Sequence, residues 1–502
     1  MANLKSLAKD TAIYGLSSII GRFLNYLLVP LYTAKMSAAS GDYGIVTNLY
    51  AYTAILFALL TYGMETTFFR YANKSEENPK KVYSTTLITV GFTSLLFVLL
   101  VWLNIGWLAP AMGMAYTAHH DYIIVMAAVV ALDAFQAIIF AYLRYKKRPI
   151  KFASLKLLFI FLNIGLNLLY FVAFPAIYKT HPNAISWIYS PDVGVGYVFY
   201  LNLVCTLVVM FCMWHELKAS SWKWDWPLLR RMFSYSWPIL ILSVAGVINQ
   251  SASQIIFPWV YPGDDTQTAS QLGIYGAAIK IAMIMALITQ AFRYAYEPFV
   301  FGGNRNKDDE AESKRSQALA MKYFLMFTLL AYLAVLAGID ILKYIIAPDY
   351  WEGLKVVPIV MAAEIMMGIY FNLSFWYKLT DRTLWGAVFS GIGCLMLVLV
   401  NVIFVPKYGY MACAWAGVAA YGSAMLLSYF TGQHYYPMKY PLQDMALYVF
   451  LTVVLSAGAL LIDTGNMWLN LVWRTFLLLL FVGVIIKREG ILDIIRHRKT
   501  AQ

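Results

Sequence analysis

Long apolar stretches separated by short polar segments follow one another along the whole 502-residue chain. A helix of about 20 apolar residues, at about 1.5 Å of rise per residue, crosses the roughly 30 Å hydrocarbon layer of a bilayer. Stretches of this kind occur at residues 12–33, 43–69, 83–108, 121–143, 152–174, 194–214, 232–258, 271–299, 319–341, 354–378, 384–405, 411–431, 442–462 and 467–486. The pattern therefore predicts an all-α polytopic membrane protein with about 14 transmembrane helices.

The composition and the distribution of charge support this reading. Hydrophobic residues make up 61% of the chain and charged residues only 13%, whereas about a quarter of the residues in soluble proteins are charged. If the N-terminus is cytoplasmic, 29 of the 38 lysines and arginines lie in or close to the cytoplasmic segments, five in or close to the outer segments, and four deeper within spans. This bias predicts that both termini are cytoplasmic. The net charge of +12 does not indicate a nucleic-acid partner, because no polar segment is long enough to form a soluble basic domain.

Several kinds of chemistry have no support in the sequence. The cysteines lie in predicted spans and form no CxxC pair, which indicates small core residues rather than a disulfide or metal site. They are Cys205, Cys212, Cys394 and Cys413. The nucleotide-binding pattern GxxxxGK[ST] is missing from the sequence, so ATP is not expected as the direct energy source. We expect no metal and no cofactor.

Two pairs of similar segments indicate an internal repeat. Asp42-Tyr-Gly-Ile resembles the run Leu-Gly-Ile-Tyr-Gly from Leu272, and pairing Gly44 with Gly273 gives an offset of 229 residues. Asn167 before LLYFVAFP resembles Asn401 before VIFVP, at an offset of 234 residues. Spans one to six and seven to twelve are therefore interpreted as two parallel copies. Such halves, related by an axis along the membrane normal, occur in secondary transporters that bind their substrate between the halves.

The repeat divides the chain into four predicted parts. A six-helix lobe (1–214) is followed by a cytoplasmic amphipathic linker (215–231), a second six-helix lobe (232–432), and an extra helix pair with a basic cytoplasmic tail (433–502). The two lobes should surround a central cavity and work by alternating access. The linker carries tryptophans and basic residues, and we interpret it as a segment that lies along the inner surface without a sensing role.

Charged residues inside the predicted spans are the candidate functional residues, because a charge at this depth is costly unless it meets water or a partner. Arg22 lies in the middle of the first span, with Asn25 on the same helical face, and should face the cavity. Lys280 is the central cation of the second half. Asp133 and Glu364 occupy equivalent spans of the two halves, and each is either a proton or sodium carrier or the counter-ion of a cation.

Several motifs resemble the polysaccharide-transport family of flippases, which shares a superfamily with the multidrug and toxin extruders and the lipid II flippases. They are the YGI and LGIYG openings, the YLRYKKRP run after Asp133, the GIYFNLSFWYKLTDRT run from Gly368, and the exit from Asn401 to Gly409. The resemblance implies a flippase, not an enzyme, that moves undecaprenyl-pyrophosphate-linked oligosaccharide across the bacterial inner membrane. Its product would serve O-antigen, capsule or exopolysaccharide synthesis.

The resemblance also implies roles for residues and partners. Arg22 and Lys280 would bind the pyrophosphate, since cations in a low-dielectric cleft suit this group. Hydroxyl-binding and stacking side chains for the sugars would be Asn25, Asn249, Gln250, Gln254, Tyr370, Asn372 and Trp376. The partners would be the bilayer, a coupling ion (H⁺ or Na⁺) and the polysaccharide polymerase machinery. Many members of the family have twelve spans. The extra pair predicted here is typical of the lipid II type, where it helps to form a groove for the lipid tail.

Two other functions remain open. A cation-coupled multidrug exporter would use the same acidic and aromatic residues. A membrane-embedded polysaccharide ligase or polymerase would share the hydropathy, but its chemistry usually requires a sizeable outer loop. The longest predicted outer segment, 175–193, has one aspartate and one histidine and lacks the paired carboxylates of sugar chemistry. The sequence therefore favours a transporter over an enzyme.

Overall fold

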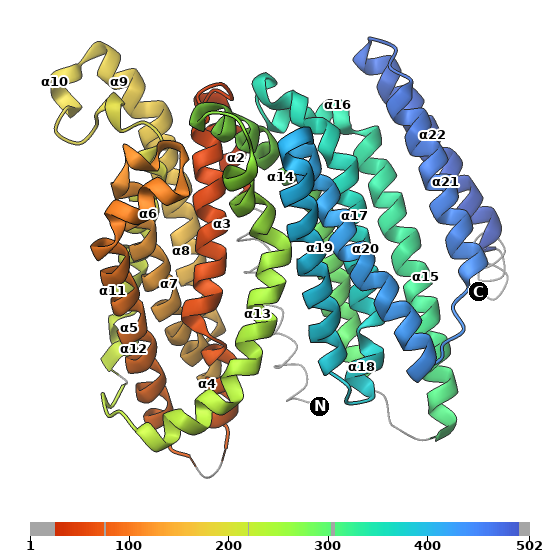
Figure 1. The fold of residues 1–502 in the computed structure, drawn as a ribbon, viewed down its shortest axis with the longest axis horizontal. Helices are drawn as coiled ribbons and strands as arrows, with labels where there is room; N and C mark the ends of the chain where they lie inside the picture. The colour runs from red at the N-terminus through yellow and green to blue at the C-terminus, as the bar shows by residue number, and fades with distance from the viewer. Residues whose placement is uncertain (1–25, 75–76, 219, 303–306, 491–502) are drawn as a thin grey trace, which may run out of the picture. The chain divides into compact units, whose positions relative to one another are not determined.

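The computed structural model describes residues 26–74, 77–218, 220–302 and 307–490, and these residues form helices without a β-strand (Figure 1). Within them, 12 helical segments are long and apolar enough to cross a membrane. A shorter apolar helix, Gly196–Cys212, corresponds to the sixth predicted span, and the first predicted span lies mostly outside the described residues. The prediction of an all-α multi-pass membrane protein is confirmed.

The described residues form two compact units. Unit 1 extends to Ala277 and includes Leu397–Cys413, whereas unit 2 comprises Ala278–Met396 and the described residues from Ala414 onward. These divisions fall within helices α14 (Asp265–Gly302), α19 (Leu384–Tyr408) and α20 (Tyr410–Tyr435). The lobe boundaries proposed from the sequence, at residues 214, 232 and 432, stay predictions.

Unit 1 is built around α7, which packs against α3, α5, α8 and α11. Small and branched residues of α7, including Ala134 and Ile138, are fully buried in its core. Helix α13 packs on α3, α4 and α5. The elements of unit 1 before α14 are α2 (Leu28–Lys35), α3 (Asp42–Thr61), α4 (Met64–Ala72), α5 (Pro79–Leu103), α6 (Ile105–Met112), η1 (Met114–Thr117), α7 (His120–Tyr145), α8 (Pro149–Leu168), the π-helical turn η2 (Leu169–Ala173), α9 (Phe174–Thr180), α10 (Pro182–Ile185), η3 (Pro191–Val193), α11 (Gly196–Cys212), α12 (Trp214–Lys218) and α13 (Trp226–Val260).

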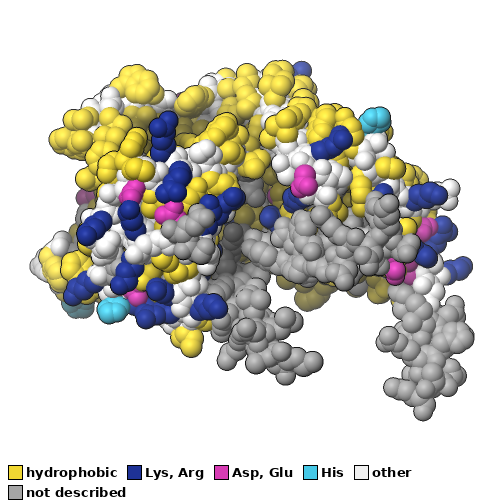
Figure 2. Space-filling model, turned by 90° about the horizontal axis from the view of Figure 1, so that it is seen from below, with side chains coloured by type: hydrophobic (Ala, Val, Ile, Leu, Met, Phe, Trp, Pro, Cys, Tyr) yellow, Lys and Arg dark blue, Asp and Glu magenta, His cyan; other side chains and the backbone are white. Residues whose placement is uncertain are grey.

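Helix α12 and the segment that joins it to α13 are held against unit 1 by charged side chains. Glu216 is 2% exposed, and its carboxylate accepts hydrogen bonds from Lys151 Nζ at 2.7 and 2.8 Å. Asp225 forms an ion pair with Lys81 and caps α13 through the backbone N–H of Leu228 at 2.7 Å. The bonded Lys81 ammonium lowers the pKa of the Asp225 carboxyl. Figure 2 shows basic side chains gathered on the face seen from below, among fewer acidic ones.

Unit 2 contains the remaining helices. α15 packs against α17, α21 and α22, and α21 packs against α22. The elements that follow α14 are α15 (Lys307–Ala337), α16 (Ile339–Leu342), η4 (Lys343–Ile345), η5 (Pro348–Val356), α17 (Val357–Leu373), α18 (Phe375–Leu379), α19, α20, α21 (Leu442–Leu461) and α22 (Met467–Arg488).

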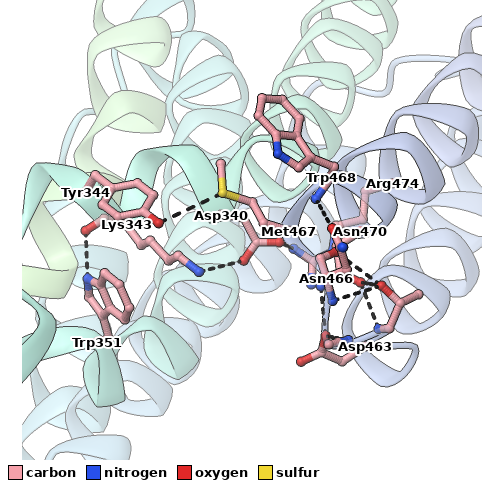
Figure 3. A network of polar contacts seen from close by, with 12 residues as sticks. Asp340, Lys343, Tyr344, Trp351, Asp463, Asn466, Met467, Trp468, Asn470 and Arg474 are labelled. Carbon is pink, nitrogen blue, oxygen red and sulfur yellow. Dashed lines mark hydrogen bonds and ion pairs between the residues drawn. The ribbon is translucent and has the colours of Figure 1, made fainter.

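Ion pairs tie the C-terminal helix pair, α21 and α22, to the rest of unit 2 at both ends. At one end, Lys322 of α15 contacts Asp444 at 3.0 Å and Glu489 at 2.7 Å. At the other end, Arg474 of α22 lies 2.6 Å from Asp340 of α16, within the polar network of Figure 3. Arg474 falls within the last predicted span, 467–486. The structure gives it a specific partner.

Candidate functional site

Of the two predicted pyrophosphate ligands, Lys280 is among the described residues and Arg22 is not. Arg22 lies outside the described residues, as does Asn25. Lys280 lies on α14 with a partly exposed side chain, and within the described residues its ammonium group makes no hydrogen bond or ion pair. A cation in a membrane span is costly without a partner. Lys280 is therefore suited to bind an anionic group.

Glycines fix the first half of α14 against α3. A Cβ on Gly44 would lie 1.8 Å from the carbonyl oxygen of Ala269, and a Cβ on Gly276 would lie 2.2 Å from Thr47 Oγ1. A Cβ on Gly273 would lie 2.9 Å from the backbone nitrogen of Gly44. The two backbones thus approach too closely for any side chain between them. The next helical turn on the same side of α14 carries the predicted pyrophosphate ligand of this helix.

A buried hydrogen bond fixes the backbone of α13 at Gln254, one of the three predicted sugar ligands on this helix. Asn48 is fully buried, and its Nδ2 donates to the carbonyl oxygen of Gln254 at 2.8 Å. Tyr116 donates in turn to Asn48 Oδ1 at 2.8 Å. The Asn249 and Gln254 side chains are half-buried, and that of Gln250 is exposed. The exposed amide of Gln250 has both a donor and an acceptor for a hydroxyl-bearing ligand.

Asp133 of α7 has a cation nearby, which the sequence analysis missed. Lys156 of α8 interacts electrostatically with Asp133, and its Nζ lies 4.1 Å from the centroid of the Phe140 ring. Near the end of α7, Arg144 and Glu65 form an ion pair at 2.7 Å. Lys156 follows the basic segment that ends at Lys151 by only five residues, so the sequence alone groups it with that segment. Its place inside the apolar run that begins at residue 152 was the signal that it belongs to a span.

Glu364 of α17 has a different environment. Its Oε2 atom is buried without a hydrogen-bond partner among the described residues. Helix α20 packs closely against α17 on either side of this residue. A Cβ on Gly417 would lie 3.5 Å from the Ala363 side chain, and a Cβ on Gly422 would lie 3.5 Å from Met366 Sδ. Of the two predicted acids, Glu364 is the one that needs a proton or a bound cation for neutrality. Across the described residues, no three His, Cys, Asp or Glu side chains form a metal-binding group.

The three candidate sugar ligands on α17 and α18 pack inside unit 2. Tyr370 donates to the carbonyl oxygen of Gly386 at 3.3 Å, and Asn372 is 7% exposed. Trp376 is 1% exposed, and its Nε1 donates to Ser428 Oγ at 3.2 Å. These contacts join α17 and α18 to α19 and α20. A role in sugar binding stays a prediction for all three, and packing is the role that this structure assigns to the indole.

Comparisons with known proteins give a family and a fold. The family described as polysaccharide biosynthesis protein matches residues 7–292, and no curated protein matches the sequence. An inward closed lipid II flippase, MurJ, has a TM-score of 0.66 at 14% identity, covering 95% of this chain and 99% of its own. An inward-facing multidrug resistance MATE transporter scores 0.60 at 14% identity, covering 82% and 93%. A mutant of the Vibrio cholerae MATE transporter VcmN scores 0.54 at 12% identity, covering 86% and 96%. At these identities the likeness concerns the fold.

Proposed function

Because this chain belongs to the polysaccharide biosynthesis protein family, we propose that it is a flippase for undecaprenyl-pyrophosphate-linked oligosaccharide. It would deliver this substrate to the outer leaflet of the inner membrane for O-antigen, capsule or exopolysaccharide assembly. The observation that carries the proposal is the family match. The fold likeness to a protein described as a lipid II flippase, over nearly the whole of both chains, supports a transporter rather than an enzyme.

The proposed cycle is alternating access between two repeated halves. Lys280 and Arg22 would hold the pyrophosphate. Lys280 makes no hydrogen bond or ion pair within the described residues, which supports this role. A cation in a low-dielectric site attracts phosphate strongly. The exposed Gln250 amide, with Asn249 and Gln254 on the same helix, would bind sugar hydroxyls. Both termini would lie in the cytoplasm, and polymerase machinery would receive the product.

Glu364 is the proposed coupling group for H⁺ or Na⁺. Its buried oxygen has no partner among the described residues, whereas Asp133 has Lys156 beside it. Loading and unloading a cation at Glu364 would therefore change the net charge of its surroundings, and the membrane potential supplies about 2.3 kcal/mol per charge at 100 mV. Asp133 is the second candidate for this role.

The test is translocation of a fluorescent undecaprenyl-pyrophosphate-linked oligosaccharide in proteoliposomes, measured by the accessibility of its sugar to an enzyme added outside. The wild type should translocate the probe, Lys280→Ala should reduce the rate at least tenfold, and Lys280→Arg should retain it. Lys355→Ala is the matched control, because this lysine is exposed and pairs only along its own helix, with Glu352. A wild type without translocation, or Lys280→Ala at the wild-type rate, would refute the proposal.

A multidrug exporter is the second candidate, favoured by the likeness to MATE folds and by the acid without a cation at Glu364. The same proteoliposomes distinguish the two functions. Transport of a lipophilic cation such as ethidium, driven by an ion gradient and abolished by Glu364→Gln but not by Lys280→Ala, would establish the exporter. A flippase for the lipid-linked oligosaccharide should not transport ethidium.

A further inference from the structure

Unit 1 carries a structured projection at the end away from its basic face. Helix α8, the turn η2 and helix α9 form one continuous helix of 32 residues, Pro149–Thr180. At about 1.5 Å per residue it is roughly 48 Å long, whereas the hydrocarbon layer is about 30 Å thick. Since Pro149 directly follows the basic inner segment, the last turns rise beyond the outer edge of this layer. Residues 174–193, which contain α9, α10 and η3, are called the outer platform (Figure 1).

Aromatic rings cluster at the base of the outer platform. The rings of Tyr170 and Phe174 have centroids 4.8 Å apart, and those of Tyr178 and Tyr189 are 5.7 Å apart. Tyr189 stacks on Tyr197 with an interplanar angle of 11° and a centroid distance of 5.5 Å. Because the rings pack on one another, they form a single preorganised surface.

Hydrogen bonds fix the aromatic cluster, and one indole ring of the outer platform is exposed to solvent. The Tyr197 hydroxyl accepts a hydrogen bond from the backbone nitrogen of Ser190 at 2.7 Å and donates to the Ser190 carbonyl at 3.1 Å. The indole of Trp187 is 80% exposed, although its Nε1 is fixed by the carbonyl of Ala184 at 3.2 Å. The π-helical turn Leu169–Ala173 lies directly below, and such turns are frequent at functional sites. The tyrosine cluster is therefore held in place, and the same platform presents the fixed and exposed ring of Trp187.

Exposed hydrogen-bonding side chains accompany Trp187 in the sequence of the outer platform. Thr180, Asn183, Ser186 and Asp192 have exposed side chains within the same short segment. A pyranose ring has an apolar C–H face and a rim of hydroxyls. An aromatic face covers the first, and amide, hydroxyl and carboxylate groups bind the second. This combination of groups matches a sugar better than it matches an acyl chain.

We propose that the outer platform is a sugar-binding site that receives the pyranose rings of the oligosaccharide on the outer face, with Trp187 and Tyr178 as stacking surfaces. The identity of the ligand rests on the proposed flippase function, and the site itself rests on the geometry above. The alternative is that the outer platform anchors the protein among the lipid headgroups, which tryptophan and tyrosine also favour. The polar side chains that accompany the rings favour the sugar.

The experiment measures binding of a fluorescently labelled, lipid-free oligosaccharide to the full-length protein in nanodiscs of neutral lipid. The oligosaccharide is released by mild acid from the lipid-linked pool of the source cells. Trp187→Ala should weaken binding about two- to tenfold, the value of one aromatic contact, and Trp187→Tyr should restore most of it. Trp107→Ala is the matched control, because this indole is 73% exposed on α6, outside the outer platform.

Each outcome decides one question. Equal binding by the wild type and Trp187→Ala overturns the site. An equal loss in Trp107→Ala also overturns it, because that result indicates a general interfacial effect. If the wild type translocates the lipid-linked probe but Trp187 has no effect on binding, only the platform fails. If lipid-free oligosaccharide binds through Trp187 but the lipid-linked probe is not translocated, the flippase proposal fails and the platform stands.

Discussion

Replacing Arg474 by methionine should loosen the C-terminal helix pair. Arg474 is 8% exposed, its Nη1 lies 2.6 Å from Asp340 Oδ2, and its Nε donates to the carbonyl of Ala459 at 2.9 Å. Methionine keeps the apolar volume but leaves Asp340 with Lys343 alone, at 3.3 Å. Removing one partner of a buried ion pair costs about 3–5 kcal/mol. The remaining lysine reduces this cost, so we expect about 2–3 kcal/mol of lost local stability.

Hydrogen exchange of the protein in nanodiscs measures this loss. Amides of α21 and α22 should exchange about 30- to 150-fold faster in Arg474→Met, since about 1.4 kcal/mol corresponds to a factor of ten. Amides of α7, in unit 1, should be unchanged. Arg474→Lys should have a smaller effect because the charge remains, and adding Asp340→Asn to Arg474→Met should recover part of the loss. Unchanged exchange in α21 and α22 would show that packing alone holds the pair.

Three further predictions follow from the buried and interfacial charges. Glu364→Gln should abolish the dependence of transport on an H⁺ or Na⁺ gradient while the protein still folds; an unaltered dependence in proteoliposomes would exclude this residue as the coupling group. Lys156→Met should lower stability by about 1–3 kcal/mol because it leaves the Asp133 carboxylate without its nearby cation, and Asp133→Asn should rescue it in thermal melts; failure to rescue would contradict the electrostatic interaction. Lys81 lowers the folded-state pKa of Asp225, so this contact stabilises the linker above the ordinary aspartate pKa of about 3.9 and is lost as pH falls through the lowered value. Exchange at 220–225, corrected for intrinsic rates, should rise only in that acidic range, and a rise near neutral pH would count against the contact.

Hydropathy predicted the spans because burial in lipid is a property of whole apolar stretches, and it was insensitive to backbone breaks within them. The predicted span 43–69 contains such a break. Gly63 has a φ of +72° and separates α3 from α4, and a Cβ there would lie 2.9 Å from Ile239 of α13. Both the left-handed conformation and the close approach favour glycine. Only the position of another helix reveals why the break is there.

The partners of the charges could not be derived from the sequence, because they depend on which helices are neighbours. Arg474 pairs with Asp340, which is 134 residues away. Lys156 interacts electrostatically with Asp133 only because α8 packs on α7. Trp376 has the residue type that sugar binding requires, yet it is 1% exposed. Residue type and depth identify candidates for a site. Packing then decides which of them remain available.

The internal repeat stays a prediction, and the positions that it pairs have similar surroundings in the structure. Gly44 and Gly273, which the offset pairs, lie in contact. Asn167 and Asn401 are both fully buried, and each donates to the carbonyl four residues earlier. Asn167 accepts from Tyr32 of α2, and Asn401 donates to a serine of α13, the corresponding helix of the second copy. Because the contact between α3 and α14 has no room for a methyl group, any rearrangement of these helices must pivot on it or break it completely.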